Sequence, residues 1–221
     1  AGEMNVTDSY EGIEGQHIRI DGGTITIIAS DDALNAADGS GAQGGGFGGM
    51  GGGQWTLTMT GGSLTVDAGG DGIDVNGSIT MSGGVMVVYG PTESMNAALD
   101  YDRAFTISAG QLIAVGSAGM AMAPDTSSTQ PAVLINLSTV QTAGTSIAIV
   151  NAAGEPIVSL TPDKSYQSLV YSGTGLTVGE QYQVVVGGAV NTSFVQNDII
   201  TRVGTTTGPG GPGNPMRPPR P

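Results

Sequence analysis

Acidic and amide side chains recur at matching positions in four short segments of this chain. The segments read Glu11-Gly12-Ile13-Glu14, Asp32-Ala33-Leu34-Asn35, Asp71-Gly72-Ile73-Asp74 and Ala97-Ala98-Leu99-Asp100. The third residue of each segment is apolar and is followed by a polar residue, and in the first three segments the first residue is also acidic. We expect the apolar residue to point inward and the polar residues outward. In register, the polar residues form three columns: Glu11, Asp32 and Asp71; Glu14, Asn35, Asp74 and Asp100; and Gln16, Asn76 and Asp102.

Such columns carry a large electrostatic cost. Two carboxylates about 5 Å apart repel by roughly 3 kcal/mol at an effective dielectric near 20, which is a large part of a typical folding free energy. Residues 1–128 hold 15 acids and only two bases, Arg19 and Arg103, so protons or a cation must neutralise the columns. Oxygen-only ligands suit Ca²⁺. We therefore predict calcium ligands at Glu11, Glu14, Asp32, Asn35, Asp71, Asp74, Asn76, Asp100 and Asp102. The alternative is a solvated acidic face whose charges salt screens.

Glycine pairs indicate the elements that would align these columns. Pairs at 22–23, 61–62 and 83–84, and the related Ala109-Gly110, are flanked on both sides by apolar residues of period two. Once a Gly-rich insertion at 38–54 is set aside, the repeat is about 22 residues of strand, turn and strand. That is too short for a propeller blade and contains no helix. Residues 1–128 are thus predicted to form a parallel β-solenoid.

The remainder of the chain has a different character. Residues 129–221 carry four acids and four bases, and residues 129–203 predict antiparallel strands near 131–137, 145–150, 156–160, 167–171, 181–187 and 193–203. This unit is expected to be a small sandwich or a sheet folded over the last coil, which would protect an open edge. Residues 204–221 form a Pro/Gly-rich tail, expected to be disordered or polyproline II when free.

Composition excludes several classes of protein. A chain with 39 Gly in 221 residues is not a helical bundle. The absence of Cys removes disulfides, Cys-ligated zinc and thiol catalysis. The net charge of -13 disfavours nucleic acid and anionic membrane surfaces as partners, and no run of 18 apolar residues is present for membrane insertion.

Several motifs, in order, resemble a known family. They are SYEGIEG (9–15), the segment 20–37, DGIDVNG (71–77) and the later GGV-VYGPT, ALDYD, GMAMAP and TPDKSYQSLVYS. Together they resemble the calcium-binding, polysaccharide-binding β-helix proteins of anaerobic bacterial cell surfaces over roughly residues 9–190. The resemblance implies an all-β, right-handed parallel β-helix similar to polysaccharide lyases, with affinity for cellulose or polygalacturonate. It also implies Ca²⁺ at Glu14, Asp32, Asn35, Asp71, Asp74, Asn76, Asp100 and Asp102.

Catalysis has little support in the residues. A lyase of this fold needs a base beside the calcium-bound sugar, yet residues 1–128 contain no Lys and His17 has no identifiable orienting partner. We therefore predict a non-enzymatic protein, with a polysaccharide lyase as a remote alternative. Tyr89 and Tyr101 flank the loop before Asp100 and are the predicted sugar-facing aromatics.

Two functions follow as expectations. The first coil has no obvious cap, and the tail offers Arg217 and Arg220 to the acidic solenoid of a neighbouring copy. Head-to-tail contact between unlike surfaces builds an open filament, so we expect a secreted structural subunit of an extracellular fibre, with some polysaccharide affinity. The alternative is a monomeric cell-surface carbohydrate-binding protein. A chain that starts at Ala1 is what signal-peptide removal would leave, as would trimming.

Overall fold

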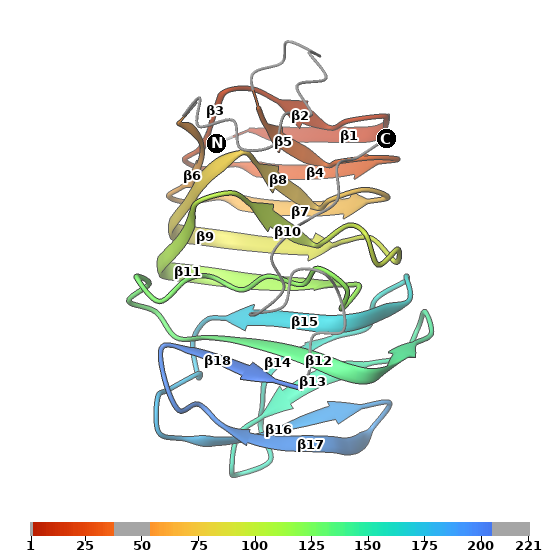
Figure 1. The fold of residues 1–221 in the computed structure, drawn as a ribbon, viewed down its shortest axis with the longest axis vertical. Coiled ribbons are helices and arrows are strands. Elements are labelled where there is room, and N and C mark those ends of the chain that lie inside the picture. Colours follow the sequence, from red (N-terminus) through yellow and green to blue (C-terminus); the bar gives the residue numbers. More distant parts are fainter. Residues whose placement is uncertain (1, 38–53, 205–221) are drawn as a thin grey trace.

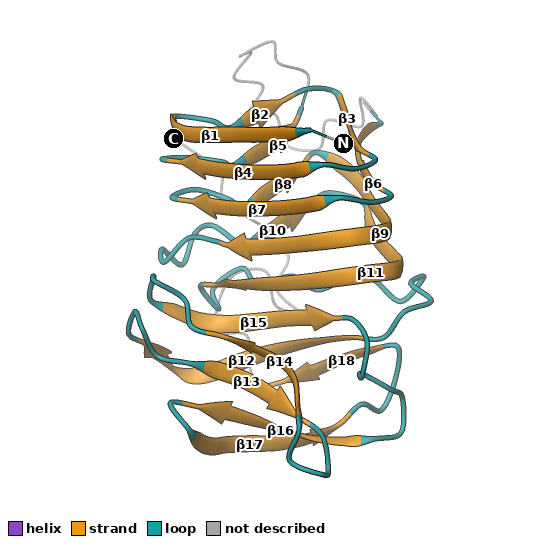
Figure 2. Cartoon of the chain, turned by 180° about the vertical axis from the view of Figure 1, so that it is seen from behind, coloured by secondary structure: helices purple, strands orange, loops and turns teal. Residues whose placement is uncertain are grey.

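The computed structural model describes residues 2–37 and 54–204. Over these residues the chain is all-β, as predicted, and consists of strands joined by turns and loops (Figure 2). No helix in the described residues is long and apolar enough to cross a membrane. The insertion predicted at 38–54, apart from Gln54, and the tail with Arg217 and Arg220 lie outside the described residues.

Alternating apolar residues on either side of the glycine pairs build the first eleven strands. These are β1 (Glu3–Ser9), β2 (Ile13–Glu14), β3 (His17–Ile20), β4 (Thr24–Ala29), β5 (Leu34–Ala36), β6 (Trp55–Met59), β7 (Ser63–Ala68), β8 (Ile73–Val75), β9 (Gly77–Tyr89), β10 (Leu99–Tyr101) and β11 (Ala104–Gly116).

Equivalent strands of successive repeats pair in parallel. One ladder runs β1-β4-β7-β9-β11, a second joins β3, β6 and β9, and the short strands form a separate sheet in the order β2-β5-β8-β10 (Figure 1). The register aligns Ile25 with Leu64, Leu64 with Met86 and Met86 with Leu112. These rows are the apolar positions of the 22-residue period, so the predicted parallel pairing of repeats is confirmed.

The inward-facing rows form one continuous core. Leu57, Met59, Leu64, Ile73 and Ile79 are all fully buried in it. Where the chain turns from one ladder to the next, the second glycine of each pair has a positive φ, for example 84° at Gly62 and 86° at Gly84. A Cβ on Gly84 would lie only 2.8 Å from the Gly62 carbonyl oxygen. Stacked turns therefore require glycine both for its conformation and for space.

The rest of the chain continues the same sheet and adds a second one. Its strands are β12 (Ala132–Gln141), β13 (Ile147–Val150), β14 (Pro156–Leu160), β15 (Tyr166–Ser172), β16 (Gln181–Val186), β17 (Ala189–Val195) and β18 (Ile200–Val203). β15 pairs antiparallel with both β11 and β12, and β18 lies parallel to β12. The ten-stranded sheet thus has β1 at one end and β18 at the other.

The second sheet, in the order β14-β13-β16-β17, packs through its own apolar cluster around Tyr166, Tyr171 and Tyr182. The last parallel strand, β11, is covered at its edge by antiparallel pairing with β15, which continues the same sheet. The single strand predicted over 193–203 is wrong. Gly187 and Gly188, with φ of 56° and 81°, begin a hairpin that starts β17 at Ala189, and the chain leaves this sheet before β18.

Candidate metal centre

The short-strand sheet sets the second carboxylate column in register. Pairing of β2 with β5, β5 with β8 and β8 with β10 aligns Glu14 with Asn35, Asn35 with Asp74 and Asp74 with Asp100. The predicted alignment is therefore confirmed. Asp74 and Asp100 are buried, whereas Glu14 at the start of the column is exposed.

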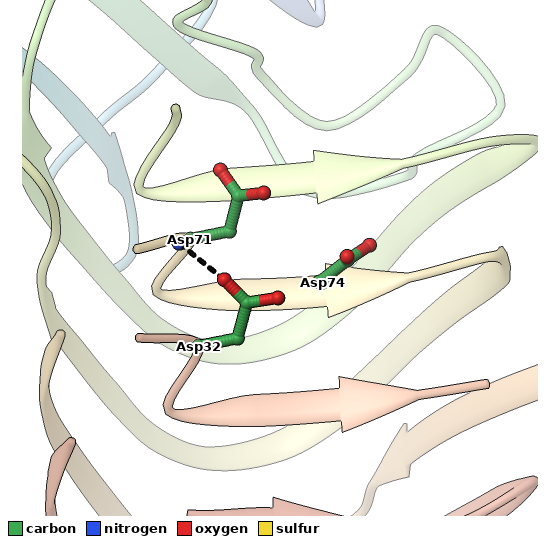
Figure 3. Close-up of side chains that lie close together, drawn as sticks. All are labelled: Asp32, Asp71 and Asp74. Atoms are coloured by element: carbon green, nitrogen blue, oxygen red, sulfur yellow. Dashed lines mark hydrogen bonds between the residues drawn. The ribbon is translucent and has the colours of Figure 1, made fainter. Parts of the chain in front are cut away.

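The first column links the repeats through its carboxylates. The backbone N–H of Asp71 donates to Oδ1 of Asp32 at 2.7 Å (Figure 3). The backbone N–H of Ala97 donates to Oδ1 of Asp71 at 2.6 Å. Asp32 and Asp71 are 3% and 0% exposed. Each of these aspartates thus uses one oxygen to satisfy a buried amide in the next repeat, as buried polar groups require.

Asp32, Asp71 and Asp74 bring three carboxylates together. One oxygen from each lies within 4.8 Å of the other two, and Asp74 is only 8% exposed. In Figure 3 the side chains of Asp32 and Asp71 project from successive turns on the same side as Asp74 of β8. Buried like charges at this spacing are costly without a compensating group. The cluster has the donor set of a site that could hold a metal ion.

Asn35 adds an observation that fits an oxygen-binding cation. Its side-chain Nδ2 donates to Oε2 of Glu11 at 3.0 Å. The other polar atom of the side chain is Oδ1. That oxygen is buried and has no hydrogen-bond partner, although Asn35 stands directly beside Asp74 in the column. A buried amide oxygen without a donor is a cost that a bound cation would remove.

The start of the columns favours protonation instead. A hydrogen bond with Glu11, followed by repulsion from its charge and slight burial, raises the pKa of Glu14 above its ordinary value. Glu14 therefore holds a proton more readily than an isolated glutamate does. A proton can thus neutralise charge at Glu14, and a cation could do so at Asp32, Asp71 and Asp74.

The third column stacks through its backbone. The N–H of Asn76 donates to the Ala36 carbonyl at 3.1 Å, and the N–H of Asp102 donates to the Val75 carbonyl at 3.1 Å. Asn76 is partly buried and Asp102 is exposed, and neither belongs to the three-aspartate cluster. The predicted ligand set is therefore spread along the stack, with its buried centre at Asp32, Asp71 and Asp74.

Gly70 also shapes the cluster, and the sequence interpretation did not include it. A Cβ at Gly70 would lie 2.5 Å from Oδ1 of Asp32 and 2.4 Å from Oδ1 of Asp31. The signal was the Gly69-Gly70 pair directly before Asp71, which breaks the phase of the other glycine pairs.

The rings of Tyr89 and Tyr101, the two predicted sugar-facing tyrosines, pack against other side chains of the protein. Tyr101 meets Phe105 edge to face with ring centroids 6.1 Å apart, and its hydroxyl donates to the Ala123 carbonyl at 2.6 Å. Burial raises the pKa of Tyr101 to about 12. Tyr89 is half-buried and packs against the second apolar cluster. Neither ring is thus placed as an open platform of the kind on which a sugar stacks.

A cavity of about 460 Å³ lies where the loop before β10 meets the start of β15. Its lining is rich in hydroxyl and amide groups, contributed by Thr92, Ser94, Ser117, Ser165 and Gln167, together with the carboxylate of Glu93. The sequence analysis predicted no site here, because the lining comes from four segments that are distant in the sequence, near residues 93, 118, 140 and 166.

Comparison of the chain with protein-family models, with curated proteins and with solved structures found no match. The resemblance to calcium-binding β-helix proteins therefore rests on the motifs in the sequence.

Proposed function

We propose that this protein is a non-enzymatic, calcium-stabilised, right-handed parallel β-helix that associates head to tail as the subunit of an extracellular fibre. The observation that carries the proposal is the position of β1 and β18 at the two ends of one ten-stranded sheet. Among the described residues β1 pairs only with β4, and β18 only with β12. Exposed edge strands are ready templates for pairing with another chain.

The end of the core at β1 supports association there. Met4 begins the apolar row that continues through Ile25, Leu64 and Met86. Leu64 and Met86 are fully buried, whereas Met4 is 50% exposed. A further strand laid on β1 would extend this row and cover Met4, and burial of apolar surface is the main favourable term in protein association.

Calcium would stabilise the subunit by binding carboxylates from successive repeats. We assign Asp32, Asp71 and Asp74 as its central ligands, and the orphaned Oδ1 of Asn35 is a fourth oxygen nearby in the column. Ca²⁺ takes six to eight oxygens with flexible geometry. Glu11, Glu14, Asn76, Asp100 and Asp102 are the remaining predicted ligands along the same columns.

Electron microscopy and light scattering of the full chain, with and without Ca²⁺, test this function. We expect fibres whose resistance to denaturant falls when a chelator is added. Deletion of residues 208–221, which removes Arg217 and Arg220, is expected to abolish fibres while leaving the circular dichroism spectrum intact. A chain that stays monomeric at all protein and calcium concentrations would contradict the proposal.

Carbohydrate binding is a second candidate, and the cavity between Ser94 and Gln167 favours it. Hydroxyl and amide groups around a space of about 460 Å³ match the hydrogen-bonding groups of a sugar. A pull-down on cellulose and polygalacturonate, with and without Ca²⁺, decides whether the protein binds. Ser94→Trp should fill the cavity and abolish retention, whereas Asp163→Ala in an exposed loop should not. Retention unchanged by Ser94→Trp would place sugar binding elsewhere.

A further inference from the structure

We propose that the joint between two copies is a parallel pairing of β18 of one copy with β1 of the next, which would merge their ten-stranded sheets into one. This inference rests on the proposed head-to-tail association and names the two strands that make it. Strand direction, hydrogen-bond phase, side-chain rows and charge each support it.

The two end strands run in the same direction. β1, β4, β7, β9 and β11 are all parallel. The direction reverses at β15 and again at β12, since both pairings of β15 are antiparallel. β18 is parallel to β12 and therefore to β1. A second copy related by translation along the sheet would thus present β1 to β18 in parallel, as between the repeats.

The hydrogen-bond phase of β1 follows from its contact with β4. The Thr24 N–H donates to the Gly2 carbonyl at 2.9 Å. Because backbone groups alternate between the two edges of a strand, Met4 and Val6 direct theirs toward β4. Glu3, Asn5 and Thr7 then direct their N–H and C=O groups to the free edge.

The phase of β18 is fixed in the same way. The Ala132 N–H donates to the Ile199 carbonyl at 2.8 Å. Thr201 and Val203 therefore direct their backbone groups toward β12, and those of Ile200 and Arg202 face the free edge.

These two phases are complementary in one register. If Ile200 stands beside Met4, its N–H meets the Glu3 carbonyl and its carbonyl meets the Asn5 N–H. Arg202 then stands beside Val6 and bonds to Asn5 and Thr7 in the same pattern. The register is also the one in which the inward rows match, because Ile200 aligns with Ala132, Ala132 with Ser172 and Ser172 with Leu112. Leu112 belongs to the row that begins at Met4.

Charge favours the same contact. β1 contains Glu3 and Asp8 and no base, whereas β18 contains the exposed Arg202 and no acid. In Figure 1, β16 and β17 lie beyond β18 along the long axis, so they would overlap the next copy near its first strands.

Cysteine cross-linking tests the joint directly, because the chain contains no Cys. The double variant Met4→Cys with Ile200→Cys, assembled and then oxidised, should give a ladder of covalent multimers on a non-reducing gel. Met4→Cys with Met95→Cys, an exposed residue of the loop between β9 and β10, is the matched control and should give no ladder. A ladder in the control and none in the test pair would overturn the joint.

A second variant avoids reliance on the oxidation step. Asn5→Pro removes an N–H that faces the free edge and leaves the β1–β4 bonds intact, a position where edge strands accept proline. We expect it to raise the concentration needed for assembly at least tenfold without lowering the melting temperature, while Asn5→Ala assembles normally. Normal fibres from Asn5→Pro, with no ladder from the cysteine pair, would overturn the joint but leave the proposed fibre standing. Absence of fibres from the unmodified chain would overturn both.

Discussion

Lys164 and Asp67 are 97 residues apart in the sequence and form an ion pair with 2.8 Å between Nζ and Oδ1. The same ammonium donates to the backbone carbonyls of Ala68 and Tyr89. Lys164 is the only lysine of the chain and lies in the loop between β14 and β15. It therefore ties the antiparallel part of the protein to the ends of two strands, β7 and β9, in the parallel part.

Replacing this lysine should weaken the fold measurably. Lys164→Met removes a charge-assisted contact to two carbonyls and a carboxylate, and we expect the free energy of unfolding to fall by about 1–2 kcal/mol. Denaturant titration measures the change. Asp163→Ala, on the neighbouring exposed residue, should change stability by less than about 0.5 kcal/mol. Equal effects from the two substitutions would contradict the tie.

Calcium should stabilise the protein through the three-aspartate cluster. At a Ca²⁺ concentration about 100 times the dissociation constant, binding adds about 2.7 kcal/mol, or a rise in melting temperature of about 5–10 °C for a chain of this size. Differential scanning calorimetry with Ca²⁺ and with a chelator measures it. A melting temperature indifferent to both would favour the solvated acidic face.

Asp71→Asn and Asp71→Ala separate the cluster's charge from its backbone contact. The asparagine keeps an oxygen for the Ala97 N–H but removes one buried charge. We expect Asp71→Asn to lose most of the response to Ca²⁺ while being at least as stable as the unmodified protein in chelator. Asp71→Ala should lose the response and also be destabilised in chelator, because a buried amide is left without its acceptor. A full calcium response in Asp71→Asn would exclude this cluster as the site.

The Glu11–Glu14 pair predicts a dependence on pH. Because the folded-state pKa of Glu14 is raised, the folded chain holds this proton more tightly than the unfolded chain. The corresponding stability is present below the unfolded pKa of about 4.3 and is lost as the pH rises through the folded value. Glu14→Gln should therefore stabilise the calcium-free protein at neutral pH and have a smaller effect near pH 4. Urea titrations at the two pH values measure this, and an equal effect at both would contradict the raised pKa of Glu14.

Comparing Gly84→Ala with Gly179→Ala separates the two reasons for glycine in a turn, backbone conformation and lack of space. Both have a positive φ, 86° and 93°, but a Cβ at Gly84 would approach the Gly62 carbonyl to 2.8 Å whereas Gly179 has nothing within 4 Å. Gly179→Ala should cost about 1–2 kcal/mol from conformation alone. Gly84→Ala should cost at least about 1 kcal/mol more, measured by thermal unfolding. If the two substitutions lower the free energy of unfolding equally, the stacked turns can move apart to accommodate a Cβ at little cost.

The parallel repeats were predictable because a period is visible in one sequence. Glycine pairs about 22 residues apart set the phase of the flanking apolar residues, and that phase aligned Asn35 with Asp74 and Asp74 with Asp100. An error of one residue would have placed Ile73 outside and Asp74 inside. The register of the candidate site therefore follows from local pattern alone.

The antiparallel part was less predictable because its pairings lack a period. Nothing local to β15 indicates that Val170 aligns with both Ala114 and Leu134. The contact of Lys164 with Asp67, and the cavity between Ser94 and Gln167, likewise depend on how distant segments pack. The buried part of the candidate metal site comprises fewer residues than the predicted columns. The repeat pattern alone does not show which of its acids are buried, because burial of Asp71 depends on packing of neighbouring segments.

The chain reverses direction at β15 and again at β12, so β18 is parallel to β1 whatever the number of parallel repeats between them. We expect that a repeat added between β4 and β11 would leave both terminal strands unaltered, because successive repeats in this part pair in parallel in the same register. Duplicating one 22-residue unit should lengthen the molecule by about 4.8 Å and add one more layer to its carboxylate columns. The number of repeats in the sequence would then set the axial spacing between subunits of any assembly, in steps of one repeat.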